Sequence, residues 1–146
     1  MDGKKFLIQI RDMNSIINSY EDELDVLMTR LTSTTSKPKD VNIMFSREDT
    51  LPENIEKVTL LKEEIKKRLE EFAKMRIEAD GYLRQIDDFR LQTVISKYYF
   101  QSKTLEQIAV EIDKSYQWTC ELRDRAVEEF EKIMKKSKKY GLLDRN

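Results

Sequence analysis

Hydrophobic residues near the N-terminus recur every three or four positions, in steps of 4, 3, 4, 3, 4, 3 and 4. This heptad spacing is typical of a helix whose apolar seam faces another helix. Packing of one amphipathic helix on a globular domain is also compatible with it, but the unbroken rhythm favours a coiled coil. The seam residues are Phe6, Ile10, Met13, Ile17, Tyr20, Leu24, Leu27 and Leu31.

A polar stretch interrupts this pattern after Leu31. Residues 32–50 are rich in Thr and Ser and contain Pro38, so they predict a loop. The short apolar segment 41–45 inside it is compatible with a docking strand, one helical turn or a mobile loop.

A second long helix is predicted from about Leu51, because Thr50 suits an N-cap and Pro52 suits the first turn. Its seam continues at spacings of three and four to Ile86, with Arg68 as the one polar break. Two long helices joined by a loop are expected to fold back as an antiparallel hairpin. Because two helices alone bury little surface, residues 1–86 are expected to form a dimerisation arm in a homodimer.

Three shorter helical segments follow. Asp87 and Asp88 suit the start of a helix that continues to Phe100, and Thr104 and Ser115 suit the N-caps of the next two. The buried positions expected in these last two helices are Leu105, Ile108, Ala109 and Ile112, then Thr119, Leu122, Ala126 and Phe130. A helix, the turn 113–115 and a longer helix form the layout of a helix-turn-helix, within a domain predicted over residues 87–140.

Composition supports an all-α fold. The chain has 146 residues, of which 38% are charged, with three Gly and two Pro, too few turn residues for many strands. Cys120 is the single cysteine, which excludes an intrachain disulfide and suits a reducing cytosol. No apolar run approaches the length needed to span a bilayer. We therefore expect a soluble cytoplasmic protein without membrane partners.

Catalytic chemistry has little support in this sequence. There is no histidine, the usual general base and metal ligand, and one cysteine cannot form a zinc site. No Gly-rich phosphate-binding loop occurs, and the carboxylates lie at the ordinary spacing of solvated helix faces. We expect neither an enzyme, nor a metal site, nor a cofactor.

A resemblance makes the C-terminal pattern more specific. Thr-Leu-x-x-Ile-Ala-x-x-Ile from Thr104, then Ser115 and Leu-x-x-x-Ala-x-x-x-Phe from Leu122, resembles region 4 of bacterial sigma factors. The whole chain is similar to small phage and prophage proteins with a helical N-terminal half, in the style of late-transcription regulators of the RinA and ArpU type. The resemblance implies a sigma-like helix-turn-helix that acts in a bacterial cell on promoter DNA, host RNA polymerase, or both.

The expected DNA-contacting residues lie around the turn and the last helix. Gln117 matches the hydrogen-bonding edge of adenine, and Glu121 matches the amino group of cytosine, but Asp124 and Glu128 on the same side would repel phosphates. Tyr116 and Trp118 are compatible with an interface or with core packing. The full predicted set is Lys103, Lys114, Ser115, Tyr116, Gln117, Trp118, Glu121, Arg123 and Arg125.

Charge leaves two functions open. The chain has a net charge of -1, and residues 88–146 hold twelve Lys or Arg against ten Asp or Glu, a net charge of +2. The lysine-rich end, residues 132–139, would contact phosphates or form a solvated helix end favoured by the helix dipole. We expect a phage-derived transcription regulator; the alternative is a non-enzymatic phage inhibitor or adaptor that binds a host protein without contacting DNA.

Overall fold

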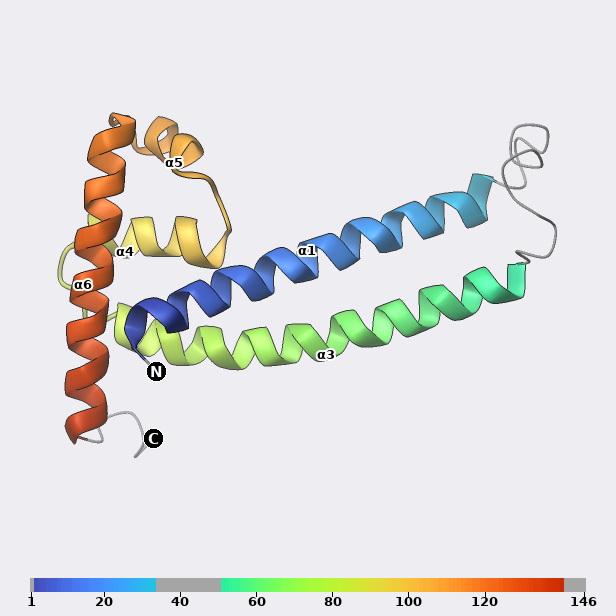
Figure 1. The fold of residues 1–146 in the computed structure, drawn as a ribbon, viewed down its shortest axis with the longest axis horizontal. Coiled ribbons are helices and arrows are strands. Elements are labelled where there is room, and N and C mark those ends of the chain that lie inside the picture. The colour runs from blue at the N-terminus through green and yellow to red at the C-terminus, as the bar shows by residue number, and fades with distance from the viewer. Residues whose placement is uncertain (1, 34–50, 141–146) are drawn as a thin grey trace. The chain divides into compact units, whose positions relative to one another are not determined.

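The structure is a computed structural model that describes residues 2–33 and 51–140 (Figure 1). Helices make up 89% of these residues and no strand occurs among them, which confirms the all-α prediction. The elements are α1 (Gly3–Ser33), α3 (Leu51–Leu83), α4 (Phe89–Ile95), η1 (Ser96–Phe100), α5 (Leu105–Ile112) and α6 (Tyr116–Tyr140). No described helix is long and apolar enough to cross a membrane.

The chain divides into two compact units, and the division falls inside the two long helices. One unit combines residues 1–15 with residues 71–146, and the other comprises residues 16–70. The predicted boundary at residue 87 therefore differs from the division found. Residues 1–15 and 71–86, the two ends of the predicted arm, belong to the larger of the two units because their hydrophobic residues pack into its core. This packing joins positions that are far apart in the sequence.

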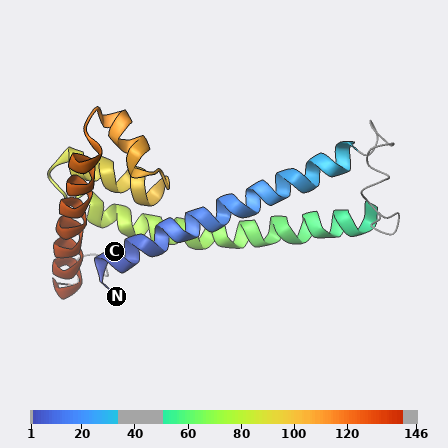
Figure 2. The ribbon, with the colours of Figure 1, turned by 45° about the horizontal axis from the view of Figure 1, so that its top comes forward.

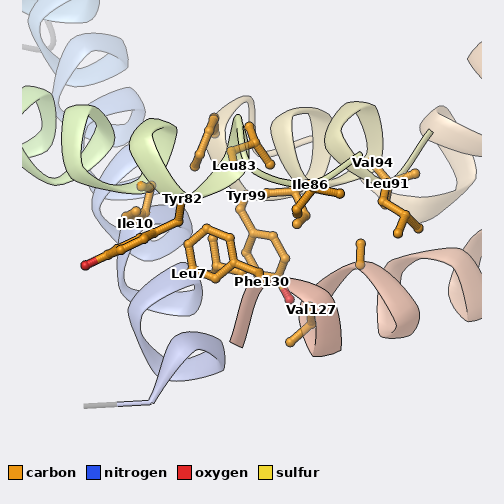
Figure 3. Close-up of a cluster of buried hydrophobic side chains, with 14 of the residues drawn as sticks. Leu7, Ile10, Tyr82, Leu83, Ile86, Leu91, Val94, Tyr99, Val127 and Phe130 are labelled. Atoms are coloured by element: carbon orange, nitrogen blue, oxygen red, sulfur yellow. The ribbon is translucent and has the colours of Figure 1, made fainter. Parts of the chain in front are cut away.

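The core of the larger unit is built around Phe130 of α6, whose side chain is fully buried. The Phe6 ring stacks on it with centroids 6.5 Å apart, and the Tyr82 ring meets it edge-on at 5.7 Å. Figure 3 shows Leu7 and Ile10 of α1 in the same cluster as Tyr99 and Val127. Elements α1, α3, η1 and α6 thus share one hydrophobic core.

Local signals set where the shorter helices begin. The Asp88 carboxylate accepts a hydrogen bond from the backbone N–H of Arg90 at 2.9 Å and caps α4, as predicted. After α4 the backbone widens by one residue per turn, so that the N–H of Gln101 donates to the carbonyl of Ser96 at 3.0 Å. Tyr99 and Phe100 of this wider turn are both buried in the core.

The described part of the smaller unit comprises two helical segments, 16–33 of α1 and 51–70 of α3. Figures 1 and 2 both show them side by side and running in opposite directions. The Arg68 guanidinium lies over the Tyr20 ring, 5.1 Å from its centroid, which places residue 20 opposite residue 68. Ile17, Val58 and Ile65 are the buried hydrophobic residues described in this unit.

The predicted coiled-coil seam is used within the chain itself. Phe6 and Ile10 are buried in the larger unit and Ile17 in the smaller one, while the other five seam residues are partly buried. The predicted loop starts too early, because Thr32 and Ser33 are helical and the Thr32 hydroxyl donates to the carbonyl of Met28 at 3.2 Å. The rest of that loop, with the Thr50 cap and segment 41–45, lies outside the described residues.

Candidate nucleic-acid interface

Helix α5 starts and ends through local side-chain and backbone contacts. The Thr104 hydroxyl accepts a hydrogen bond from the N–H of Gln107 at 3.1 Å, and the Gln107 side chain accepts one from the N–H of Thr104 at 2.9 Å. This reciprocal pair satisfies two amide groups that a helix start leaves unpaired. It confirms Thr104 as the predicted N-cap, and buried Ile108 and Ala109 hold the helix against the core.

The turn between α5 and α6 depends on Asp113. Its backbone is left-handed, with φ of 57° and ψ of 50°, a conformation that Asp tolerates better than most non-glycine residues. The next amide, that of Lys114, donates to the carbonyl of Ala109 at 2.9 Å and closes the helix end. Ser115 then caps α6, since its hydroxyl accepts from the N–H of Trp118 at 3.1 Å.

Helix α6 separates buried from exposed residues as predicted. Thr119, Leu122, Ala126 and Phe130 are all at most 2% exposed. The buried Thr119 hydroxyl is satisfied because it donates to the carbonyl of Ser115 at 2.8 Å. The opposite face exposes Gln117, Glu121, Asp124 and Glu128. Leu105 and Ile112 of α5 are only partly buried, although the sequence predicts both in the core.

Two cations lie against the half-buried Trp118 at the start of α6. The Lys114 ammonium is 5.1 Å from the indole centroid, and the Arg90 guanidinium of α4 is 5.8 Å from it. Arg125 is exposed, and its charge helps to lower the pKa of Asp88, after the larger effect of the Asp88 hydrogen bonds with Arg90. Arg90, Lys114 and Arg125 therefore form a cationic group around Trp118 and Asp88, in which Arg90 is itself paired with Asp88 at 3.3 Å.

Two other predicted cations are engaged elsewhere. The Lys103 ammonium pairs with Glu111 at 2.7 Å, Lys97 pairs with the same carboxylate, and these bonds lower the Glu111 pKa. Arg123 pairs with Asp124 at 3.1 Å and lies over the Tyr98 ring, 5.2 Å from its centroid. The predicted set therefore divides: Lys103 and Arg123 hold local ion pairs, while Lys114, Ser115, Tyr116, Gln117, Trp118, Glu121 and Arg125 lie at the turn or on exposed or half-buried parts of α6.

Sequence reasoning missed two arginines of this unit. Arg90 was missed because its position after the Asp88 cap carries no sign of the distant Trp118. Arg11 of α1 donates to the carbonyls of Tyr98 and Lys103, the latter at 3.1 Å, and its guanidinium lies 4.0 Å from the Tyr98 ring centroid. Arg11 thereby fixes the segment that leads into α5, and no sequence pattern links residues so far apart.

An apolar hollow of about 190 Å³ lies next to the cationic group. Phe89, Ile112, Trp118 and Leu122 contribute its hydrophobic wall, and Arg90 and Lys114 lie at it as well. Phe89, the first residue of α4, is 76% exposed. Tyr116 is also exposed, at 51%, and a hydrogen bond with Cys120 raises its pKa.

In comparisons of this chain with family models, curated proteins and solved structures, none of the three gives a match.

Proposed function

We propose that the chain is a phage-type transcription regulator that binds promoter DNA through α5, the turn 113–115 and α6, arranged as a helix-turn-helix. The supporting observation is the capped start of α6, where Gln117 and Glu121 are exposed and where Arg90 and Lys114 lie against the ring of the neighbouring Trp118. An amide and a carboxylate on a helix start are suited to base edges, and adjacent cations are suited to phosphates.

The weak net charge sets how such binding would behave. Few cations face the proposed DNA side, and Asp124 and Glu128 lie on the same helix face. Binding through so few phosphate contacts is weak at physiological salt and has a shallow dependence on salt concentration. The lysines of the α6 end, which include the exposed Lys132, Lys135 and Lys136, would add contacts along the backbone.

Fluorescence anisotropy of labelled duplex DNA across a salt series tests this proposal. We expect binding below about 100 mM salt, and we expect Arg90→Ala or Lys114→Ala each to reduce the slope of log affinity against log salt by about one unit. Lys5→Ala is the matched control, because Lys5 is an exposed cation on α1. No binding at the lowest salt would refute the proposal, and equal slopes for all variants would refute this site.

A protein partner is the second candidate function. The hollow beside Phe89 favours it, because an exposed aromatic residue at an apolar depression is typical of an interface anchor. A phage inhibitor or adaptor would use this face on RNA polymerase or another host protein. Size-exclusion chromatography with purified bacterial RNA polymerase tests it: co-elution that Phe89→Ser abolishes supports the adaptor function, and separate elution counts against it.

A further inference from the structure

The two described helical segments of the smaller unit, 16–33 and 51–70, expose much hydrophobic surface. Large hydrophobic side chains that are at least 38% exposed occur on both of its helices: Ile16, Val26, Met28, Leu51, Ile55, Leu60 and Leu69. Stable helical architectures bury such faces against a further layer. Within residues 16–33 and 51–70, the two packed helices supply one layer, and no described segment covers these exposed side chains.

One face of this unit is hollowed into an open groove of about 630 Å³. Its centre is apolar, with Val26 and Leu27 from α1 facing Leu60 and Leu61 from α3. Its remaining lining is charged: Glu23, Arg30, Lys57 and Glu64. The groove therefore combines an apolar middle with charged ends.

The charges are arranged symmetrically about that apolar middle. On α1, Glu23 lies three residues before Val26, and Arg30 lies three residues after Leu27. On α3 the order is reversed, since Lys57 lies three residues before Leu60, and Glu64 three residues after Leu61. We call Val26 with Leu27, and Leu60 with Leu61, the central pairs of the two helices. A two-fold rotation that reverses the direction of each helix about its central pair would exchange the acidic position of that helix with its basic position.

Within one chain the same arrangement gathers like charges. With residue 20 opposite residue 68, the antiparallel helices bring position 23 level with position 65, next to Glu64, and position 30 level with position 58, next to Lys57. One end of the groove is therefore acidic and the other basic. Arg68 offsets part of the acidic charge, because it pairs with one oxygen of Glu64 at 3.0 Å.

We propose that a second copy of this chain covers the groove, with the same face used by both copies. The two-fold axis runs across the two helices, parallel to this face, at the level of the central pairs. Each α1 segment then packs antiparallel on its counterpart, as does each α3 segment. Glu23 of either copy faces Arg30 of the other, and Lys57 faces Glu64. The result is a four-helix bundle in which the acidic end of each copy meets the basic end of its partner.

The size of the face indicates a dimer of moderate strength. Segment 16–33 is about 27 Å long at 1.5 Å per residue, and two adjacent helices are about 20 Å wide. The face is then about 500 Å² per copy, or about 1,000 Å² in total, which is near the lower limit for a specific interface. We therefore expect a micromolar dissociation constant for the dimer. Formation of this dimer does not depend on DNA binding.

Sedimentation velocity of the full chain at 1–500 µM tests the proposal through charge reversal. The wild type should show twice the 17.5 kDa mass of one chain at the higher concentrations. Glu23→Arg and Arg30→Glu should each raise the dissociation constant at least tenfold, because each creates two repulsive pairs across the axis. Asp25→Arg is the control, an exposed charge on α1 outside the groove lining, and should leave it within threefold.

Restoring the charge pattern separates this arrangement from a general loss of stability. The double variant Glu23→Arg with Arg30→Glu keeps opposite charges across the axis and should dimerise as the wild type does. An equimolar mixture of the two single variants should form a mixed dimer. A monomeric wild type at every concentration, unaffected single variants, or a double variant as weak as the singles would overturn the proposal.

Discussion

Replacing Phe130 with Ala tests whether α1, α3 and α6 share one core. The Phe130 ring is fully buried and contacts the rings of Phe6 and Tyr82. Truncating a buried Phe to Ala costs about 3–5 kcal/mol in the free energy of unfolding, through lost burial and the cavity that remains. For a unit of this size, that loss lowers the melting temperature by roughly 12–40 °C.

Urea unfolding followed by circular dichroism gives this free energy, and thermal unfolding gives the melting temperature. Tyr116→Ala is the control, since it removes an aromatic ring that is 51% exposed and should change the free energy by less than about 0.5 kcal/mol. If Phe130→Ala is unfolded at 25 °C, Phe130→Leu retains part of the burial and gives a smaller, measurable loss. A loss below about 1 kcal/mol for Phe130→Ala would refute the shared core.

Three further predictions concern single positions. Gly3→Ala should lower the free energy of unfolding by about 1–3 kcal/mol, because a Cβ there would lie 2.7 Å from Cγ and 3.0 Å from Cα of Glu131. A higher free energy of unfolding for this variant, measured in urea, would contradict this close approach. Thr104→Ala should cost about 1 kcal/mol through the lost cap, whereas Thr104→Ser should cost little; equal losses in the same assay would exclude the capping role. Burial raises the pKa of Tyr99 to about 12, so the folded state favours the neutral phenol. The stability that this contributes is present below pH 10 and is lost as the pH rises towards 12. The free energy of unfolding of the wild type minus that of Tyr99→Phe should therefore fall over that range, and a constant difference would contradict the shift.

The sequence predicts the short helices well because their signals are local. The caps at Asp88, Thr104 and Ser115 act on amides two or three residues away, so a single sequence is enough to place them. The inward face of α6 follows in the same way from helical spacing. The left-handed residue Asp113 fits the predicted turn because Asp tolerates that conformation.

Contacts between distant residues explain what the sequence does not predict. The heptad spacing from Phe6 indicates a helix with an apolar seam, but it does not show that Phe6 meets Phe130 within the same chain. Lys103 and Arg123 are surface cations by sequence, yet Glu111 and Asp124 engage them once the chain folds. Arg90 joins the candidate site through its distance to Trp118, which only the folded arrangement of α4 and α6 defines.

The central claim, that the start of α6 contacts DNA bases, is tested most directly through Gln117. Duplexes would first be enriched from a randomised library with the wild type, and the affinities for enriched and scrambled duplexes would then be compared. Gln117→Ala should reduce this affinity ratio at least fivefold and leave binding to the scrambled duplex nearly unchanged. Gln9→Ala, an exposed glutamine on α1, should keep the wild-type ratio. An unchanged ratio for Gln117→Ala, or no enrichment by the wild type, would contradict the claim.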